Sequence, residues 1–557
     1  MKRLKNINKL AIAAMFMLFA AGCSKYIDKK PLDAFSDLDY WNSESNVKTF
    51  CWGFYNDLFD GYGHGWSGGR YYFTSFSDDQ ADPTFENFAK NAPASDGNWN
   101  FGDIRKANLV IARVPDVPMD QEAKNHWTGV ARFFRAFNYF QLVKRFGDVP
   151  FYNSVLDISD SAIYKPRDPR NMVMDSVLAD LDYAVNNCRA STGDNTINKD
   201  VALALKSRVC LWEGTYAEYR ENDNARAAKY LKECKDASAA LINGGYTLNS
   251  DYKTEYNSES LQGNPETILY MDYEADVLMH PTVGYTNSTT PMNGLTKDAV
   301  ESYVCSDGLP ISISSEYKGD ANIDSVRSNR DKRLLESISD FYCYNGNLVA
   351  GMHSSTGYRP SKFLPDGVVY PGDYKTAPYN TTDAPLFWLA ETMENYAEAA
   401  AELDKLGTEA ITQSDLDMSI NKLRARAGVA ALEIDGSQGT AINGVPFVDP
   451  NKDPDVTSLI WEIRRDRRSE LIMDGFRYDD LIRWGKLDYM DTQLNPDCIL
   501  GAKIPDNPDI NVNADGYIMP YSDGTTRTPQ SRDYFAPIPT SQIALYPNGA
   551  LQQNPGW

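Results

Sequence analysis

The stretch that decides the fold runs from Leu459 to Leu487 and reads LIWEIRRDRRSELIMDGFRYDDLIRWGKL. Apolar residues recur at helical spacing on one face of its first half, at Ile460, Ile463 and Leu471. Arg467 falls within the same stripe, and because a cation on a buried face needs a partner, we expect it to be paired. Gly475 suits a left-handed helix end, and the aromatic residues after it predict a second helix. We therefore interpret the stretch as a core-facing corner of two helices rather than an active site.

Further helices are predicted upstream of this corner. Glu44 to Phe59 is expected to form the first helix. Asp120 to Phe146 predicts a long helix that is buried on several sides, because its aromatic residues spread around the whole circumference. This helix is expected to stop at Gly147, with Pro150 just beyond.

Two helical hairpins of tetratricopeptide size follow. In the first, one helical face begins at Val201 and the second helix runs to Gly245. In the second, Pro385 is expected to open a helix, and Ser414 with Asp417 is expected to cap the next one, which ends at Gly428. Such hairpins stack into curved scaffolds. The sequence therefore predicts a mainly α fold with a tetratricopeptide-like scaffold over about 40–245 and 383–490.

Between the hairpins, residues 246–382 lack sustained helical periodicity and are rich in Tyr, Ser, Thr, Asn and Gly. So long an irregular stretch in a compact scaffold indicates a separate subregion or a functional surface. The segment Asp60 to Phe73, DGYGHGWSGGRYYF, combines glycine with aromatic residues, which suits a binding loop. Residues 491–557 form a C-terminal segment, and no linker divides the chain, so we expect one domain over 23–557.

The N-terminus has the pattern of an export signal. Lysine and arginine precede an apolar run from Leu10 to Ala21, which is too short to span a bilayer. Ala20, Ala21 and Gly22 then precede Cys23, as at a lipoprotein cleavage site. We expect 1–22 to be a signal peptide and Cys23 to carry the lipid anchor.

Charge and cysteine content exclude several classes of protein. The formal net charge is −22, so the surface repels phosphate backbones and nucleic acid is excluded as a partner. Membrane attachment must then come from the lipid rather than from basic residues. The other seven of the eight cysteines show no paired spacing, and buried free thiols are expected.

Patterns for catalysis and metal binding are weak. Residues 65–69 fit G-x-S-x-G, and Gly63, Gly65 and Gly68 fit G-x-G-x-x-G, but a helix precedes this loop where both motifs need a strand. The four histidines have no metal-binding spacing. Asp78, Asp79 and Asp82 offer carboxylates for calcium, but an exposed acidic turn is the commoner explanation of such a cluster. We predict neither a catalytic nor a metal site, and no cofactor.

Aromatic residues in loops are the strongest ligand-binding candidates. Sugar rings stack their C–H faces on such side chains, while charged and amide groups bond their hydroxyls. The predicted ligand-binding residues are Trp66, Arg70, Tyr71, Tyr72, Asp79, Trp99, Tyr285, Tyr358 and Arg359.

Several strings resemble the SusD/RagB family of surface lipoproteins. Asp466 to Leu471, Asp474-Gly475 and Arg477 to Gly485 match its signature, with aspartate replacing glutamate twice. The strings RAFNYFQLVKRFGDVPF and FAPIPTSQIALYPNGALQQNPGW are also similar to family segments. The resemblance runs from Cys23 to Trp557.

The resemblance implies a lipid-anchored protein on the outer face of the outer membrane. Such a protein captures an oligosaccharide or polysaccharide, without chemistry, for a TonB-dependent SusC-like transporter. A peptide-binding RagB-like role, a surface hydrolase and a purely structural lipoprotein are the alternatives.

Overall fold

The computed structural model describes residues 40–557, apart from 158, 287–291, 367–377 and 523. The predicted signal peptide and Cys23 lie outside the described residues. The mainly helical fold predicted from the sequence is confirmed. Among the described helices, none is both long and apolar enough to cross a membrane.

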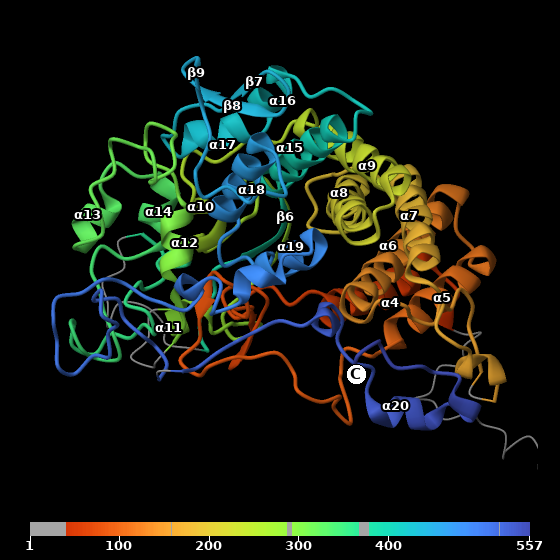
Figure 1. Ribbon diagram of the computed structural model, residues 1–557. Helices are drawn as coiled ribbons and strands as arrows, with labels where there is room; N and C mark the ends of the chain where they lie inside the picture. The colour runs from red at the N-terminus through yellow and green to blue at the C-terminus, as the bar shows by residue number, and fades with distance from the viewer. Residues whose placement is uncertain (1–39, 158, 287–291, 367–377, 523) are drawn as a thin grey trace, which may run out of the picture.

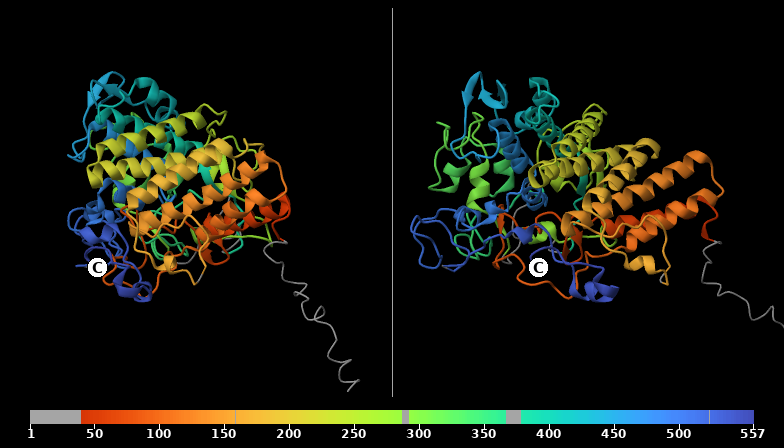
Figure 2. Two further views of the ribbon diagram at one scale, coloured as in Figure 1. Left: turned by 90° about the vertical axis from the view of Figure 1, so that its right-hand side faces the viewer. Right: turned by 45° about the vertical axis from the view of Figure 1, so that its right-hand side comes forward.

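One side of the molecule is a stack of long helices (Figure 1). Its members are α4 (Glu44–Leu58), α5 (Gly102–Arg113), α6 (Gln121–Phe146), α7 (Arg170–Asn187), α8 (Lys199–Tyr216), α9 (Asn224–Ile242) and α15 (Leu389–Lys405). From α5 onward each helix packs against the next, through α6, α7, α8 and α9 to α15. Figure 2 shows these helices as successive layers. This is the stacking that the helical hairpins predicted.

The long helix α6 is capped at both ends by the residues that the sequence indicated. The Asp120 side chain accepts from the Ala123 N–H, and Gly147 ends the helix with φ +73°. Aromatic residues on several faces are buried, because α6 lies between α4, α5 and α7. The predicted limits of this helix are confirmed.

The second predicted hairpin needs three corrections. Pro385 does not open a helix; it lies in β6 (Ala384–Trp388), which pairs antiparallel with β4 (Thr267–Met271), and α15 begins only at Leu389. The cap of the following helix is Thr412 with Asp415, not Ser414 with Asp417. That helix is also divided at Ser419 into α16 (Gln413–Met418) and α17 (Ile420–Arg426).

The other side of the molecule is built from short elements (Figure 1). They are α10 (Thr254–Asn257), α11 (Thr282–Thr286), α12 (Lys297–Ser302), α13 (Ile323–Arg327) and α14 (Lys332–Ser337), with strands β1 (Gly63–His64), β2 (Ser67–Gly68), β3 (Gln80–Ala81) and β5 (Gly294–Leu295). β1 pairs with β2, and β3 with β5. Tyr256, Tyr303 and Phe363 belong to a hydrophobic core of this side. The irregular region predicted from composition is thus a packed subregion.

The signature corner lies between the two sides. It consists of α18 (Ser458–Glu470) and α19 (Arg477–Trp484), and α18 packs on α15 while α19 packs on α8. A small sheet of β7 (Glu433–Asp435), β8 (Gly439–Ile442) and β9 (Val445–Phe447) covers one end. The C-terminal segment, with α20 (Thr540–Leu545), runs along the lower edge in Figure 1.

Candidate ligand-binding site

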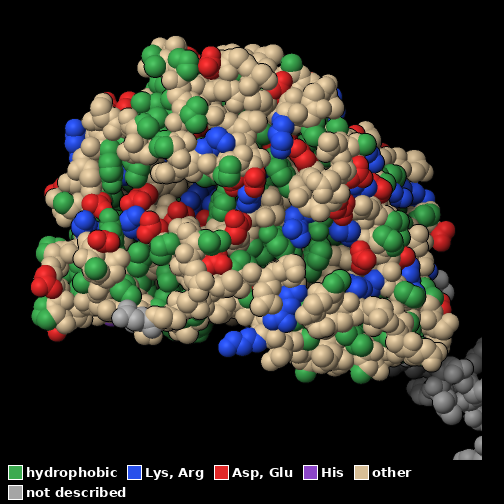
Figure 3. Space-filling view, in the orientation of Figure 1, with side chains coloured by type: hydrophobic (Ala, Val, Ile, Leu, Met, Phe, Trp, Pro, Cys, Tyr) green, Lys and Arg blue, Asp and Glu red, His purple; other side chains and the backbone are tan. Residues whose placement is uncertain are grey.

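Buried ion pairs fix the signature corner. Arg467, expected to be paired, donates from Nε to Asp480 Oδ2 at 2.9 Å and from Nη1 to Asn395 Oδ1 at 2.8 Å. Asp466 accepts from Arg333 at 2.8 Å and from Arg424 at 2.7 Å. Figure 3 shows further side chains of both charges at the surface over the middle of the molecule. The buried pairs hold together the two sides of the protein, so the corner is structural, as the sequence indicated.

The turn between α18 and α19 reaches the glycine-rich segment 60–73. Met473 and Gly475 both have positive φ, +63° and +75°. The Met473 carbonyl accepts from the Tyr72 N–H at 2.6 Å, and the Gly475 carbonyl accepts from Arg70 Nη2 at 3.3 Å. The Arg70 guanidinium also lies 4.2 Å from the centre of the Phe476 ring. The turn thus positions Arg70.

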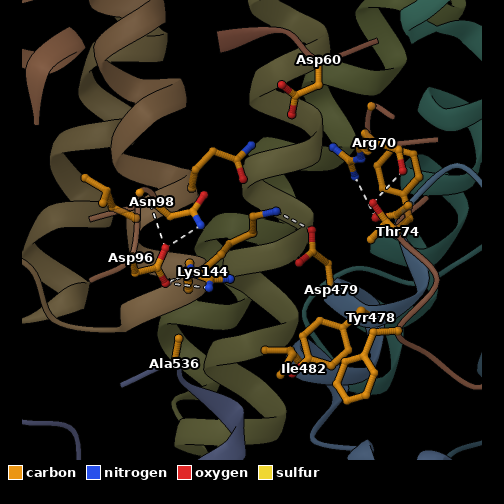
Figure 4. Close-up of a pocket in the computed structure, with 18 of the residues that line it drawn as sticks. Asp60, Arg70, Thr74, Asp96, Asn98, Lys144, Tyr478, Asp479, Ile482 and Ala536 are labelled. Carbon is orange, nitrogen blue, oxygen red and sulfur yellow. Dashed lines mark hydrogen bonds and ion pairs between the residues drawn. The ribbon is translucent and has the colours of Figure 1, made fainter. Parts of the chain in front are cut away.

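A cavity of about 860 Å³ lies beside this turn. Its walls come from the glycine-rich segment, α6, β6, α19 and the C-terminal segment. Figure 4 shows Asp60 and Arg70 on one side, Asp96 and Asn98 on the other, and Lys144 with Asp479 between them. The volume is in the range of pockets that hold small organic ligands.

Most charges that line the cavity are paired within the protein. Lys144 pairs with Asp479, Arg145 with Asp96 at 2.7 Å, and Arg208 with Glu391 at 2.6 Å. Among the carboxylates, Asp103 pairs with Lys106 at 2.8 Å and Asp474 with Lys362 at 2.7 Å.

Asp60 and Arg70 differ from these residues. Within the described part of the chain, neither has an ion-pair partner, although both line the cavity. Burial lowers the pKa of Arg70, and the nearby Arg208 lowers it further. The pKa of Lys144 is lowered by burial and by Arg70, against the effect of Asp479. The cavity therefore offers one cation and one carboxylate that are not engaged in an ion pair among the described residues.

Three aromatic residues, of which only Trp66 is exposed, lie together where the glycine-rich segment meets α11. The Trp66 side chain is 65% exposed, and its ring centre lies 6.4 Å from that of Tyr285. Phe73 lies 5.7 Å from Tyr285 in an edge-on arrangement. The hairpin of β1 and β2 needs glycine here, because a Cβ at Gly63 would lie 2.1 Å from the Ser67 carbonyl oxygen. We call Trp66, Phe73 and Tyr285 the aromatic cluster.

The structure thus brings three of the nine predicted ligand-binding residues to accessible positions: Trp66, Arg70 and Tyr285. The other six have buried side chains. Tyr71 donates to the Pro385 carbonyl, Tyr72 to the Asn293 carbonyl, Arg359 to Ser339, and Arg468 donates to Asp79; Trp99 packs on Phe146, and Tyr358 packs on Tyr342. Of these six, only Tyr71 also lines the cavity, and the other five do not.

The weak catalytic and calcium patterns fall on ordinary structural features. Residues 65–69 lie around the two-residue strand β2, without the strand-to-helix turn that a nucleophile needs. Asp78 pairs with Arg477 at 2.7 Å and Asp79 with Arg468 at 2.6 Å, which engages both carboxylates. Among the described residues, no group of His, Cys, Asp and Glu is arranged to hold a metal ion.

The sequence did not indicate Asp60, Asp96, Lys144 or Asp479 as site residues. Lys144 belongs to a helix whose sequence predicts burial on several sides, and Asp479 belongs to the structural corner, so neither pattern pointed to a ligand site. Asp60 is the first residue of the glycine-rich segment and carries no pattern of its own. Only its position directly after a helix, at the start of a segment rich in glycine and aromatic residues, could have drawn attention to Asp60.

Comparisons with known proteins show the family of this chain. The model of the SusD family matches residues 253–557, and a second model, described as starch-binding and associating with the outer membrane, matches 70–211. The chain therefore belongs to the SusD family.

Individual relatives extend the match over nearly the whole chain. SusD-like protein P38 of Formosa agariphila is 24% identical over 87% of this chain and 93% of its own length. A SusD-like carbohydrate-binding protein from Bacteroides fragilis has a TM-score of 0.68 and 21% identity, covering 91% of this chain and 99% of its own. A laminarin-binding SusD-like protein has a TM-score of 0.54 and 18% identity, covering 93% and 100%. These structures establish the shared fold.

Proposed function

We propose that this protein captures an oligosaccharide in the cavity beside the signature turn, without changing it chemically. The observation that carries the proposal is that Asp60 and Arg70 line one cavity as the ionic groups without a partner of opposite charge among the described residues. A sugar hydroxyl can both donate and accept, so neighbouring hydroxyls can donate to Asp60 and accept from Arg70. The aromatic cluster next to the cavity offers flat faces for the C–H side of the rings.

The charge arrangement supports binding rather than hydrolysis. Glycoside hydrolysis uses two carboxyl groups that flank the bond, one of which has a raised pKa. Burial acts to raise the pKa of Asp96, but the Asn98 N–H and Arg145 hold it below its usual value. Asp479 is engaged by Lys144. Burial raises the pKa of two other lining carboxylates, Asp474 and Asp533. Both are engaged within the protein, Asp474 by Lys362 at 2.7 Å and Asp533 by the Gln530 N–H at 2.7 Å. Among the cavity residues described, Asp60 therefore lacks a second unengaged carboxylate with which to form a hydrolytic pair.

The proposal extends to location and partner. Cys23 would carry the lipid that anchors the chain to the outer membrane, and the captured sugar would pass to a SusC-like TonB-dependent transporter. The match to a family described as associating with the outer membrane supports the location. Two structural relatives are named for carbohydrate and laminarin binding, which favours a glycan over a peptide ligand.

Calorimetry tests the proposal directly. Soluble protein (residues 24–557) is titrated with a panel of polysaccharides, oligosaccharides and peptide pools, and each mixture is checked for product. We expect saturable binding to a glycan without turnover. Product formation would make the protein a hydrolase, and binding to peptides alone would favour the RagB-like alternative.

Two variants test whether the glycan binds in the cavity. Arg70→Gln and Asp60→Asn should each weaken glycan binding about tenfold or more, because each removes a charged hydrogen-bonding group. Arg105→Gln and Asp116→Asn change the same charges at exposed positions outside the cavity and should bind as the wild type. Equal binding by all four variants would mean that the glycan binds elsewhere.

A further inference from the structure

Hydrogen bonds hold residues 554–557 in place beside the cavity. Asn554 Nδ2 donates to the Phe146 carbonyl at 3.1 Å and to the Ala536 carbonyl at 2.7 Å. Its Oδ1 accepts from Arg167 at 2.6 Å. One side chain thus ties the chain end to the last residue of α6 and to the C-terminal segment. The residues that follow Asn554 have a defined position.

Trp557 is held at its edges and covered on one face. Its Nε1 donates to the carbonyls of Arg532 at 3.2 Å and Phe535 at 3.1 Å, and its backbone N–H donates to the Asn554 carbonyl at 3.2 Å. The Arg532 guanidinium lies 4.5 Å from the centre of the ring. Gly556, with φ +87°, allows this close approach, because a Cβ there would lie 2.9 Å from Arg532 Cβ.

Despite these contacts, Trp557 is not part of the hydrophobic core of the described residues. Its side chain is partly exposed and lines the cavity, and it is absent from the hydrophobic clusters of the described residues. Its neighbour in the cavity wall, Ala536, lies on the Asp96 side in Figure 4, away from Arg70. A rigid indole, backed by a cation and open to a polar cavity, is a surface on which a sugar ring can stack.

We propose that Trp557 is a stacking platform for a pyranose ring of the bound oligosaccharide, at the end of the cavity away from Arg70. This inference rests on the proposed function and adds a residue to it. A chain of sugars held by Arg70 and Asp60 at one end and by Trp557 at the other must contain more than one ring.

Oxidative footprinting of the wild-type protein tests the contact without any substitution. Trypsin cleavage after Arg532 releases residues 533–557, in which Trp557 is the one tryptophan. Residues 49–70 form another tryptic peptide and carry Trp66 together with Trp52, which is 49% exposed on α4 and does not line the cavity. Laminarihexaose, maltohexaose and xylohexaose are each added before oxidation, together with any glycan found by calorimetry.

We expect a bound hexaose to reduce oxidation of Trp557 about threefold or more and to leave Trp52 unchanged. If a hexaose binds and protects Trp66 while Trp557 oxidises as in the free protein, the inference is wrong and the proposed function stands. If calorimetry detects no binding to any glycan, the proposed function fails as well.

Two variants separate stacking from a structural role. Trp557→Phe keeps a flat ring but loses the indole N–H, whereas Trp557→Leu keeps an apolar side chain without a flat face. We expect Kd to rise about tenfold for the leucine variant and about threefold or less for the phenylalanine variant. Both variants lose the indole N–H bonds to the Arg532 and Phe535 carbonyls, so both should lower Tm by a similar amount. A purely structural residue would leave the affinity of the folded protein unchanged in both variants, and that result would overturn the inference.

Discussion

Lys362 Nζ lies 2.7 Å from Asp474 Oδ1, and both side chains are fully buried. Lys362 also donates to the Ile472 carbonyl at 2.8 Å, and Asp474 Oδ2 accepts from the Tyr256 hydroxyl at 3.0 Å. Lys362 belongs to the side of short elements, and Asp474 belongs to the turn that positions Arg70. The pair therefore connects the packing of one side of the molecule to the geometry of the cavity.

Substituting Lys362 by methionine should destabilise the protein strongly at alkaline pH. Removing one member of a buried ion pair leaves the other charge uncompensated, which costs about 3–5 kcal/mol of unfolding free energy. Burial already raises the pKa of Asp474 to about 6 in the presence of Lys362, and the substitution should raise it further. The loss should thus be largest at pH 8 and smaller at pH 5, where Asp474 takes up a proton. Urea unfolding at both pH values measures this difference.

The double variant Lys362→Met with Asp474→Asn is the control. It contains no buried unpaired charge, so it should be more stable than the single lysine variant at pH 8 and should show little pH dependence from this position. A single variant whose loss is the same at pH 5 and pH 8 would contradict the role of the Asp474 charge.

Glu394 should be a position where removing a charge stabilises the protein. Both of its carboxyl oxygens are buried without a hydrogen-bond partner in the described part of the chain. Burial, together with Asp466 and Glu470, raises its pKa well above the usual value of 4.5. Because the unfolded chain ionises at lower pH than the folded one, this residue lowers stability increasingly as pH rises above 4.5. Glu394→Gln should therefore raise Tm by a few degrees at pH 8, with a smaller gain at pH 5.

Glu398, one turn further along α15, is the matched control. It is equally buried, but it accepts from Arg483 at 2.6 and 2.7 Å and from Trp484 Nε1 at 2.7 Å. Glu398→Gln should leave Arg483 underpaired and lower Tm at pH 8. If both glutamine variants shift Tm in the same direction, the hydrogen bonds of the glutamate do not decide whether its replacement raises or lowers Tm.

Trp66 and Trp99 should respond in opposite ways to replacement by alanine. Trp66 is exposed in the aromatic cluster, so Trp66→Ala should weaken glycan binding and leave Tm unchanged. Trp99 is 8% exposed and packs edge-on against Phe146 at 5.0 Å, so Trp99→Ala should cost about 3–5 kcal/mol of unfolding free energy. Calorimetry and thermal unfolding of both variants check this. Full-strength binding by the folded Trp66 variant would exclude the aromatic cluster from the site.

The difference between these two tryptophans shows what the sequence could predict. Local signals sufficed for α6, because the Asp120 cap, the periodic aromatic residues and Gly147 all lie within one stretch. They failed at Pro385, because β6 exists only through pairing with β4, more than a hundred residues earlier. No local pattern tells the exposed Trp66 from the buried Trp99, since both lie in glycine-containing loops. The cavity itself needs segments 60–74, 137–145, 474–482 and 533–557 together, which only the folded chain provides.

Gly475 should affect both stability and binding when a methyl group is added. Its φ of +75° is strained for alanine, which costs about 1–2 kcal/mol, and the new Cβ would lie 2.7 Å from Arg70 Cγ. Gly475→Ala should therefore lower Tm and also displace Arg70, which weakens glycan binding. Gly407→Ala is the control, because Gly407 has φ +71° but open space around it. It should lower Tm by a similar amount and leave binding unchanged, so equal affinities for the two variants would mean that the turn does not position Arg70 for the ligand.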